Sequence, residues 1–153
     1  MAIDTLYGQK ILEAAATIPS AERLPSPDAS ATKVSRVCGS SLTLDLALTG
    51  GVVSNYGLEA QACALGQAAA SLTVQNIIGA DAASLFVLRR QMRAMLKDQG
   101  GGPSNPRFAD LGALAAIRDY PQRHASTLLI FDAIADCLLQ LGYHDPAEDC
   151  RTE

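Results

Sequence analysis

The sequence of 153 residues has little charge and few aromatic side chains. Charged residues make up 18% of it, aromatic residues 5%, and tryptophan is absent. The formal net charge is −4, and no extended block of lysine and arginine occurs. At long range, a protein of this charge repels the phosphate backbone of nucleic acids and the surface of anionic lipids. We therefore expect no nucleic-acid partner.

Long uninterrupted hydrophobic runs are also missing. The most apolar segments, around residues 62–72 and 127–141, are interrupted by Gln67 and by Asp132 and Asp136. Neither segment approaches the roughly 20 apolar residues that cross a bilayer. The first residues lack both the basic and apolar regions of a secretory leader and the arginines of a transit peptide. These absences predict a cytoplasmic protein with no membrane association.

Several common catalytic signatures do not occur. The sequence contains no G-x-G-x-x-G, G-x-x-x-x-G-K-[ST], H-E-x-x-H or G-x-S-x-G motif, so nucleotide use has no support. Its two histidines are His124 and His144. His144 stands beside Asp145-Pro146, a sequence typical of a solvated turn. Only His124 remains as a histidine candidate for chemistry.

Hydrophobic residues are abundant, at 48% of the chain, which is enough to fill the core of one domain. We predict a single domain over residues 1–141, followed by a C-terminal tail over residues 142–153. A core of this size does not need disulfides, so the even number of cysteines carries little information.

Residues 32–62 show a period of two, which is typical of strands. Leucines alternate with other residues at positions 42–48, and this alternation predicts a half-buried strand. Gly50-Gly51 supplies the turn of a hairpin, with a third strand following from Val52. A weaker strand over residues 32–37 is expected to precede the pair.

Helical periodicity occupies most of the remaining chain. It predicts a first helix before the sheet, and after Cys63 a series of helices separated by glycine and proline. The predicted helical ranges are 4–17, 64–79, 82–99, 111–118 and 122–141. Strands followed by helices, without βαβ alternation, predict an α+β domain with a three-stranded antiparallel sheet and helices packed on one face.

Two cysteines occupy positions where chemistry is plausible. Cys38 stands beside Gly39 at the junction between strands, where a tight backbone can expose the sulfur. Cys63 stands where the third strand gives way to a helix, and free N–H groups at a helix start stabilise a thiolate. Burial as a small hydrophobe explains either cysteine equally well. His124, in the first turn of the last helix, joins them as a metal ligand only if the fold brings the three together.

The remaining cysteines and one basic stripe have simpler interpretations. Cys137 lies on the apolar side of the last helix and is expected to pack in the core. Cys150 falls in the tail. Arg89, Arg93 and Lys97 recur at intervals of four and form either a solvated helix face or a dock for an acidic partner.

Three segments together resemble a known family. They are VCG around Cys38, C-A-x-G-x-A-x-A-S from Cys63, and P-x-R-x-x-S from Pro121 to Ser126. In this order they resemble the iron-sulfur cluster scaffold family of IscU, SufU and the NifU N-terminal domain, over residues 6–141. The resemblance implies the IscU/SufE-like α+β fold. It also implies a non-enzymatic scaffold or carrier that receives sulfur from a cysteine desulfurase and passes a cluster to client proteins.

The resemblance also implies a ligand set. Cys38 and Cys63 match two cysteines that are cluster ligands and sulfur acceptors in the family, and His124 and Ser126 complete the expected cofactor-binding residues. The expected metal ligands are Cys38, Cys63 and His124. Two family positions differ here, since Ser40 replaces an aspartate and Ser126 replaces the third cysteine. A [2Fe-2S] cluster normally takes four protein ligands, so we expect labile binding of a cluster or of iron, with zinc as an alternative occupant in purified protein.

Three functions remain open from the sequence. The leading hypothesis is a divergent scaffold or carrier for iron or a cluster. The second is a SufE-like protein that accepts persulfide sulfur and stimulates a desulfurase. The third is a metal-free adaptor of the assembly machinery. The sequence leaves open whether the chain forms a homodimer.

Overall fold

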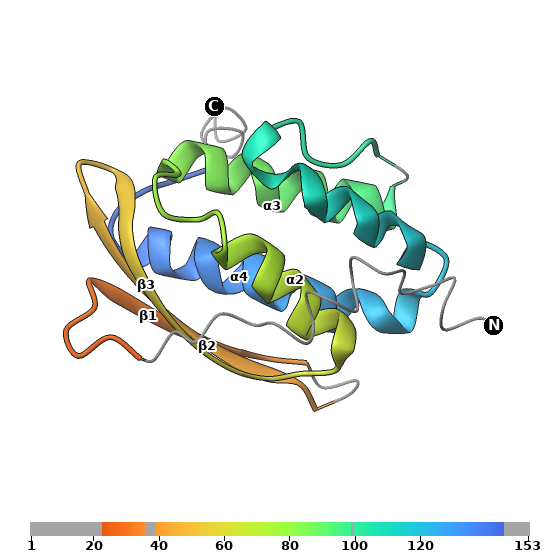
Figure 1. Cartoon of the computed structure of the whole chain (residues 1–153), viewed down its shortest axis with the longest axis horizontal. Helices are drawn as coiled ribbons and strands as arrows, with labels where there is room; N and C mark the ends of the chain where they lie inside the picture. The colour runs from red at the N-terminus through yellow and green to blue at the C-terminus, as the bar shows by residue number, and fades with distance from the viewer. Residues whose placement is uncertain (1–22, 36–38, 99, 146–153) are drawn as a thin grey trace.

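A computed structural model describes residues 23–35, 39–98 and 100–145. The predicted helix over residues 4–17, together with Cys38 and Cys150, lies outside these ranges. Within them the order of elements is three strands followed by helices. Figure 1 shows the strands as one curved sheet with the helices gathered on one side of it.

The sheet is antiparallel, with its strands in the order β1-β2-β3. The strands are β1 (Ala29–Val34), β2 (Ser41–Thr49) and β3 (Val52–Gln61). The side chains of Leu42, Leu44 and Leu46 are all buried, which confirms the alternation predicted for β2. The sequence-based prediction of a three-stranded meander is correct, although β1 begins and ends three residues earlier than expected.

A glycine pair closes the hairpin between β2 and β3. Gly50 has a φ of 62° and Gly51 a φ of 82°. A type I′ turn requires positive φ at both central residues, and glycine adopts it without a steric penalty. The turn pairs Thr49 with Val52, and a bulge between Ala47 and Leu48 then shifts the register by one residue. Leu44 therefore faces Leu58, and both leucines lie on the buried face.

Two helices follow β3. Helix α2 (Ala64–Val74) ends five residues before the predicted stop at Gly79. Turns continue as far as that glycine, where Arg107 donates to the carbonyls of Asn76 and Ile78. Helix α3 (Ala82–Lys97) begins as predicted at Asp81, whose side chain accepts a hydrogen bond from the backbone N–H of Ser84.

The last third of the chain contains 3₁₀ turns and the longest helix. A 3₁₀ segment, η1 (Pro106–Ile117), replaces the short α-helix expected over residues 111–118 and begins directly after the glycine-rich loop. A short turn, η2 (Pro121–Arg123), leads into α4 (His124–Gln140). The long final helix is therefore confirmed, with Pro121 at its entrance as expected.

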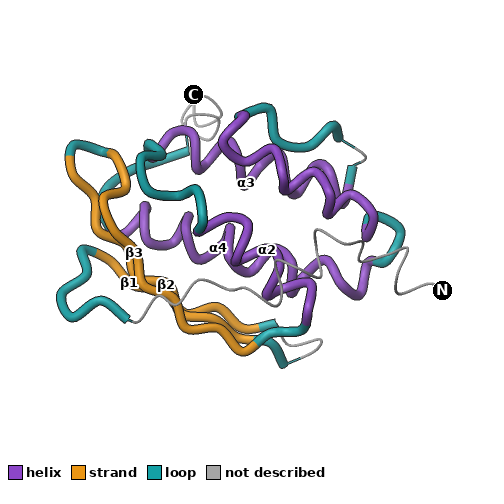
Figure 2. Tube along the Cα trace, in the orientation of Figure 1, coloured by secondary structure: helices purple, strands orange, loops and turns teal. Residues whose placement is uncertain are grey.

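The helices form layers over one face of the sheet. Helix α4 packs on β1 and β2, while α2 and α3 pack on α4. Figure 2 shows the same arrangement as a trace, with the helical segments on a single side of the strands. This is the predicted α+β architecture. No helix in residues 23–35, 39–98 and 100–145 combines the length and the apolar character needed to cross a membrane.

Asp45 is buried, although the alternation of β2 placed it on the polar face. Its carboxylate accepts hydrogen bonds from Arg23 Nε at 2.7 Å, from the backbone N–H of Leu24 at 2.9 Å and from the hydroxyl of Ser30. The segment before β1 therefore covers part of the second face of the sheet. Periodicity alone cannot reveal this contact, because it depends on a loop more than 20 residues away.

Candidate functional site

Cys63 lies at the point where the sheet passes into the helical layer. It is two residues beyond the end of β3 and is the N-cap residue of α2, as the sequence predicted. Its side chain makes no capping hydrogen bond to the helix, and the residue is partly exposed. The sulfur is thus free to interact with groups outside its own helix.

Ser126 is in direct contact with Cys63. Its Oγ lies 3.3 Å from Cys63 Sγ, in the first turn of α4, and the serine is only 2% exposed. The Ser126 hydroxyl also lies 3.3 Å from the carbonyl oxygen of Arg123, to which it donates a hydrogen bond. The hydroxyl of Thr127 donates to the same carbonyl at 2.9 Å. Residues 63 positions apart in the sequence therefore meet at the beginnings of two helices.

A glycine in α2 allows this meeting. A Cβ atom added at Gly66 would lie 2.8 Å from Ala62 Cβ and 3.2 Å from the carbonyl oxygen of Ser126. Carbon atoms that are not bonded do not approach so closely without displacement of one of them. Gly66 is thus required because α2 passes directly against the backbone of α4 beside the Cys63–Ser126 contact.

Ser40 approaches Cys63 from the loop before β2. Its Oγ accepts a hydrogen bond of 3.3 Å from the backbone N–H of Cys63, and the serine is 4% exposed. Gly39 has a φ of 75°, which suits the tight turn at this point. These residues border an open pocket of about 510 Å³, lined by Gly39, Ser40, Ala60, Gln61, Ala62, Cys63 and Gln67. We call it the Cys63 pocket.

Comparison with known proteins agrees with this arrangement. Residues 6–127 match the model of the NifU-like N terminal domain. The chain belongs to this family. A nitrogen-fixing NifU-like protein (N-terminal) from Brucella abortus is 46% identical, with a TM-score of 0.89 over 92% of this chain and 97% of the other.

Two further relatives extend the comparison. The iron-sulfur cluster assembly scaffold protein IscU of Thermotoga maritima is 27% identical over 105 residues, which are 69% of this chain and 72% of that protein. FiSufU from Fervidobacterium islandicum AW-1, described as a scaffold protein for the SUF system, is 17% identical, with a TM-score of 0.79. That alignment covers 88% of this chain and 98% of the other, and at this identity it shows the fold alone.

Ser40 and Ser126, the two serines that contact Cys63, stand at positions marked by the family resemblance. In the resemblance, Ser40 stands at the position of an aspartate and Ser126 at the position of a third cysteine. Both side chains contact Cys63 in the structure, one through the backbone and one through the sulfur. Ser40 and Ser126, which are far apart in the sequence, therefore both lie against Cys63.

His124 is engaged elsewhere. The ring is 4% exposed, and Nε2 lies 3.1 Å from the carbonyl oxygens of both Ile117 and Arg118 at the end of η1. Carbonyl oxygens only accept hydrogen bonds, so Nε2 carries the proton and the lone pair of the neutral ring is on Nδ1. These contacts hold Nε2 to η1 rather than to Cys63, and any metal bound by His124 must therefore bind Nδ1.

Cys38 lies outside the described residues, so its distance from Cys63 is not part of the structure. In the described ranges, no group of three or more His, Cys, Asp or Glu side chains is placed to hold a metal ion. Cys63 is accordingly the single thiol among the residues that line the Cys63 pocket. Its described neighbours there supply oxygen atoms rather than sulfur.

Gln67 is the residue that sequence analysis missed. It lies one helical turn after Cys63, and its backbone N–H donates to the Cys63 carbonyl at 2.9 Å. Its side-chain oxygen, Oε1, is buried and has no hydrogen-bond partner in the part of the chain that the structure describes. The interruption of an apolar stretch by Gln67 was visible in the sequence, but it was used only to exclude a membrane helix.

Cys137 is part of the core, as predicted. It is fully buried, and its sulfur donates to the carbonyl oxygen of Leu44 at 3.6 Å. Burial raises the pKa of the Cys137 thiol to about 12, with a further contribution from the charge of Asp136. A neutral thiol in this position neither binds metal nor attacks sulfur at neutral pH.

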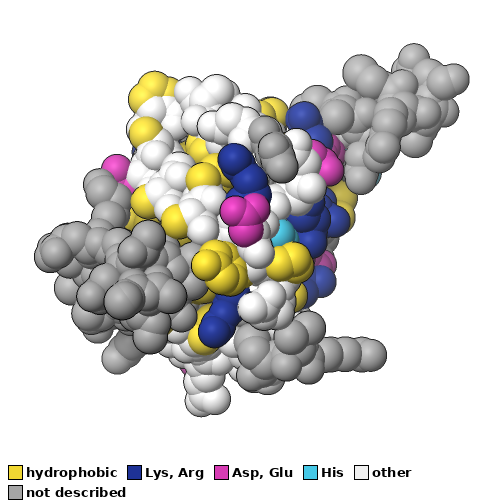
Figure 3. All heavy atoms as spheres, turned by 90° about the vertical axis from the view of Figure 1, so that its right-hand side faces the viewer, with side chains coloured by type: hydrophobic (Ala, Val, Ile, Leu, Met, Phe, Trp, Pro, Cys, Tyr) yellow, Lys and Arg dark blue, Asp and Glu magenta, His cyan; other side chains and the backbone are white. Residues whose placement is uncertain are grey.

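The predicted basic stripe on α3 is partly paired with α4. Arg89 Nε lies 2.9 Å from Asp132 Oδ1, and Arg93 lies 3.8 Å from the same oxygen. Figure 3 shows lysine and arginine side chains gathered along one side of the face in view. The ion pairs with Asp132 hold Arg89 and Arg93 against α4. The described contacts do not test whether the stripe is a dock for an acidic partner.

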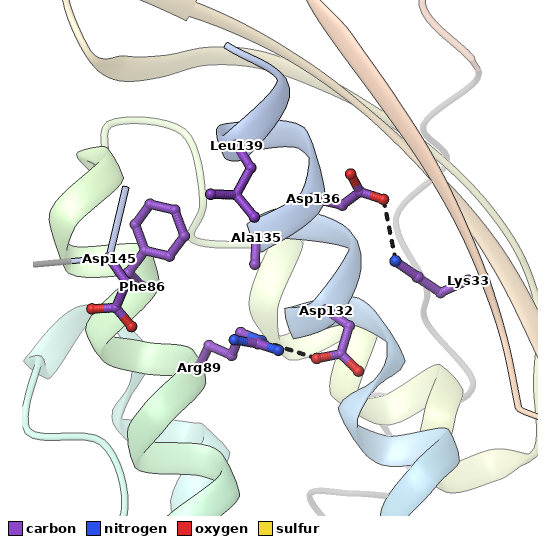
Figure 4. A pocket seen from close by; sticks show the side chains of 8 residues that line it. All are labelled: Lys33, Phe86, Arg89, Asp132, Ala135, Asp136, Leu139 and Asp145. Carbon is purple, nitrogen blue, oxygen red and sulfur yellow. Dashed lines mark hydrogen bonds and ion pairs between the residues drawn. The ribbon is translucent and has the colours of Figure 1, made fainter. Parts of the chain in front are cut away.

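A second pocket, of about 480 Å³, lies beside these ion pairs. Its walls come from β1, α3 and α4 and from the chain after α4. In Figure 4, Lys33 points to Asp136 and Arg89 to Asp132, at 3.1 Å and 2.9 Å. Asp145, also at the pocket, is paired with Arg90. The charged side chains of this second pocket are thus paired with opposite charges. The Cys63 pocket is therefore the better candidate for chemistry.

Proposed function

We propose that this chain is an iron-sulfur cluster assembly scaffold whose cargo is bound in the Cys63 pocket. The observation that carries the proposal is the contact of Cys63 Sγ with Ser126 Oγ at 3.3 Å, with Ser40 hydrogen-bonded to the same cysteine. In this NifU-like domain, residues that match family ligand positions thus come together at one exposed thiol.

The donor atoms fit a labile cargo. Iron-sulfur clusters are held mainly by thiolates, and a hydroxyl ionises far less readily than a thiol. Cys63 supplies sulfur, Ser126 supplies oxygen, and Cys38 is the chain neighbour of Gly39, which lines the pocket. We propose that Cys38 and Cys63 bind iron or a [2Fe-2S] cluster, with Ser126, and with His124 through Nδ1. Loose binding suits a protein that passes its cargo to tighter sites.

The Ser126 hydroxyl lies within reach of two hydrogen-bond acceptors. Its Oγ lies 3.3 Å from the Arg123 carbonyl oxygen and 3.3 Å from Cys63 Sγ. A hydroxyl has one proton, which can rotate between these two acceptors. Ser126 is therefore placed to hydrogen-bond the sulfur of Cys63.

Anaerobic reconstitution tests the proposal. Ferrous iron and sulfide are expected to give a visible chromophore on the wild-type protein, and Cys38→Ala and Cys63→Ala are expected to abolish it. Cys137→Ala is the matched control, because it removes a buried thiol distant from the pocket and should leave the chromophore intact. A colourless wild-type product, or the same chromophore in all four proteins, would count decisively against a cluster scaffold.

A sulfur relay is the second candidate, and one observation favours it. Among the described residues that line the pocket, Cys63 is the one thiol, and a persulfide needs no more than one. In this reaction the Cys63 thiolate attacks the outer sulfur of a desulfurase persulfide, forms a new S–S bond and releases the desulfurase thiolate. Mass spectrometry after incubation with desulfurase and cysteine would then show one added sulfur on Cys63 without iron. If metal content and sulfur content are both unchanged by the cysteine substitutions, a metal-free adaptor is the remaining function.

A further inference from the structure

The buried oxygen of Gln67 has no hydrogen-bond partner among the residues that the structure describes. A buried amide oxygen without a partner costs about 1–3 kcal/mol, and natural proteins contain few such atoms. Three other glutamines use their side chains in hydrogen bonds. Gln75 donates to Ser71, Gln91 to Ser104, and Gln140 to the carbonyl oxygen of Ser30.

The position of Gln67 connects it with Cys63. Gln67 lies in the first turn of α2, and its backbone N–H donates to the carbonyl of Cys63, the N-cap residue, at 2.9 Å. Both line the Cys63 pocket. The amide of Gln67 and the thiol of Cys63 are therefore available to one bound group.

The chemistry of the oxygen restricts what that group is. An amide oxygen has two lone pairs and no proton, so it needs a hydrogen-bond donor or a metal cation. No lysine or arginine is among the described residues that line the pocket. The described contacts of Cys63 add only hydroxyl oxygen to the thiols of the proposed ligand set. A neutral amide oxygen can complete the coordination of iron without adding charge.

The geometry points to Gln67 Oε1 as an oxygen ligand of the iron that Cys63 binds. The inference rests on the proposed function and extends it, since it supplies one of the ligands that the two serine replacements remove. In this role the Gln67 oxygen would bind iron when the metal first enters the site. Sulfide or persulfide sulfur would be added to the bound iron afterwards.

Cobalt(II) is a suitable probe, because its visible bands report coordination geometry and its near-ultraviolet charge-transfer band reports bonding to thiolate. Gln67→Leu removes the oxygen at similar size and is expected to weaken cobalt binding by at least about tenfold and to alter the visible bands. The charge-transfer band should persist, since Cys63 is unchanged. Gln67→Glu keeps an oxygen, adds charge and is expected to bind cobalt more tightly than wild type.

Gln75→Leu is the matched control. It makes the same chemical change at the exposed end of the same helix, away from the residues that line the pocket, and it should bind cobalt like wild type. A second measurement needs no metal. Because Gln67→Leu removes an unpaired buried oxygen, the metal-free variant should unfold about 2–4 °C higher than wild type. A variant that is both more stable and weaker in binding has not simply lost its fold.

The outcomes separate this inference from the function on which it rests. If Cys63→Ala abolishes cobalt binding while Gln67→Leu and Gln67→Glu bind like wild type, the role of Gln67 is wrong and the scaffold proposal stands. If Gln75→Leu weakens binding as much as Gln67→Leu, the ligand role is equally refuted, since the effect then does not depend on the pocket. If Cys63→Ala binds cobalt like wild type, the proposed function is refuted, and the inference about Gln67 is refuted with it.

Discussion

At the scale of single residues, an oxygen stands where the resemblance expects a sulfur. Ser126 Oγ touches the sulfur of Cys63, and Ser40 binds the backbone of the same cysteine. Under the proposed function, a hydroxyl in place of a thiolate at position 126 is expected to lower the affinity for the cargo, because thiolates are the preferred ligands of clusters. Exchange of that one oxygen for sulfur should therefore change the strength of binding.

Ser126→Cys should bind the cargo more tightly. The introduced thiol would lie in contact with Cys63 and supply a second thiolate, so removal of iron by a chelator is expected to slow about tenfold or more. Loss of the visible chromophore after reconstitution measures this rate. Ser54→Cys, at an exposed position on β3, adds a thiol outside the pocket and should leave the rate unchanged. Equal rates in wild type and Ser126→Cys would contradict a ligand role for this position.

At the scale of elements, the pocket depends on how closely two helices approach. Small residues of α2 bring its first turns against the start of α4, and Gly66 is the point of closest approach. Both helices begin at the pocket, α2 directly after Cys63 and α4 two residues before Ser126. A change in their separation thus acts on the site without changing any residue that contacts the cargo.

Gly66→Ala tests this dependence. Alanine favours a helix over glycine by about 1 kcal/mol, but its Cβ would lie 2.8 Å from Ala62 Cβ, and overpacking of this kind costs about 1–3 kcal/mol. We expect a net loss of stability in urea unfolding, together with weaker cobalt binding as α2 moves away from α4. Gly112→Ala is the control, because a Cβ there meets no atom within 4 Å and should stabilise the protein or leave it unchanged.

The elements differ in how far the sequence predicted them. The β2–β3 hairpin was predictable because leucine alternation and Gly50-Gly51 are local signals. The predicted end of α2 was wrong because Arg107 donates hydrogen bonds to carbonyls of the turn that follows the helix. A residue about 30 positions away in the sequence leaves no local signal. The 3₁₀ form of η1 was also missed, since proline and glycine predict a break but not the type of helix that follows.

The site was predictable only in part. Family motifs identified Cys63, Ser126 and Ser40 as related positions, and the structure brings all three together. The hydrogen bonds of His124 to η1 depend on how α4 packs and could not be predicted from the first turn of a helix. Gln67 was missed because an isolated glutamine in an apolar helix carries no motif.

At the scale of the whole molecule, helices cover one face of the sheet, and the segment before β1 covers part of the other. Helices cover one face with an apolar core, whereas the segment before β1 is tied to the other through the buried carboxylate of Asp45. Burial alone would raise the pKa of Asp45. Hydrogen bonds from Arg23, Ser30 and the Leu24 N–H outweigh that effect and hold the pKa of Asp45 below its ordinary value.

The stability of the protein should therefore fall in acid partly through Asp45. A lowered pKa in the folded state contributes stability above the unfolded pKa of about 3.9, and this contribution is lost as the pH falls through the folded value. Asp45→Asn should lower the free energy of unfolding at pH 7 by about 1–3 kcal/mol, with the difference narrowing below about pH 4. Urea unfolding across pH measures it. Asp98→Asn removes the same charge at an exposed site, and an equal effect there would disprove the role of Asp45.

The Arg123 carbonyl accepts two hydroxyl groups at once, from Ser126 and from Thr127. That duplication makes the Ser126 proton redundant for the integrity of the helix start, since the Thr127 bond alone satisfies the oxygen. The Ser126 hydroxyl can then turn from that carbonyl to Cys63 Sγ, which lies at the same distance of 3.3 Å, without any movement of the backbone. Thr127 holds the start of α4 in either arrangement.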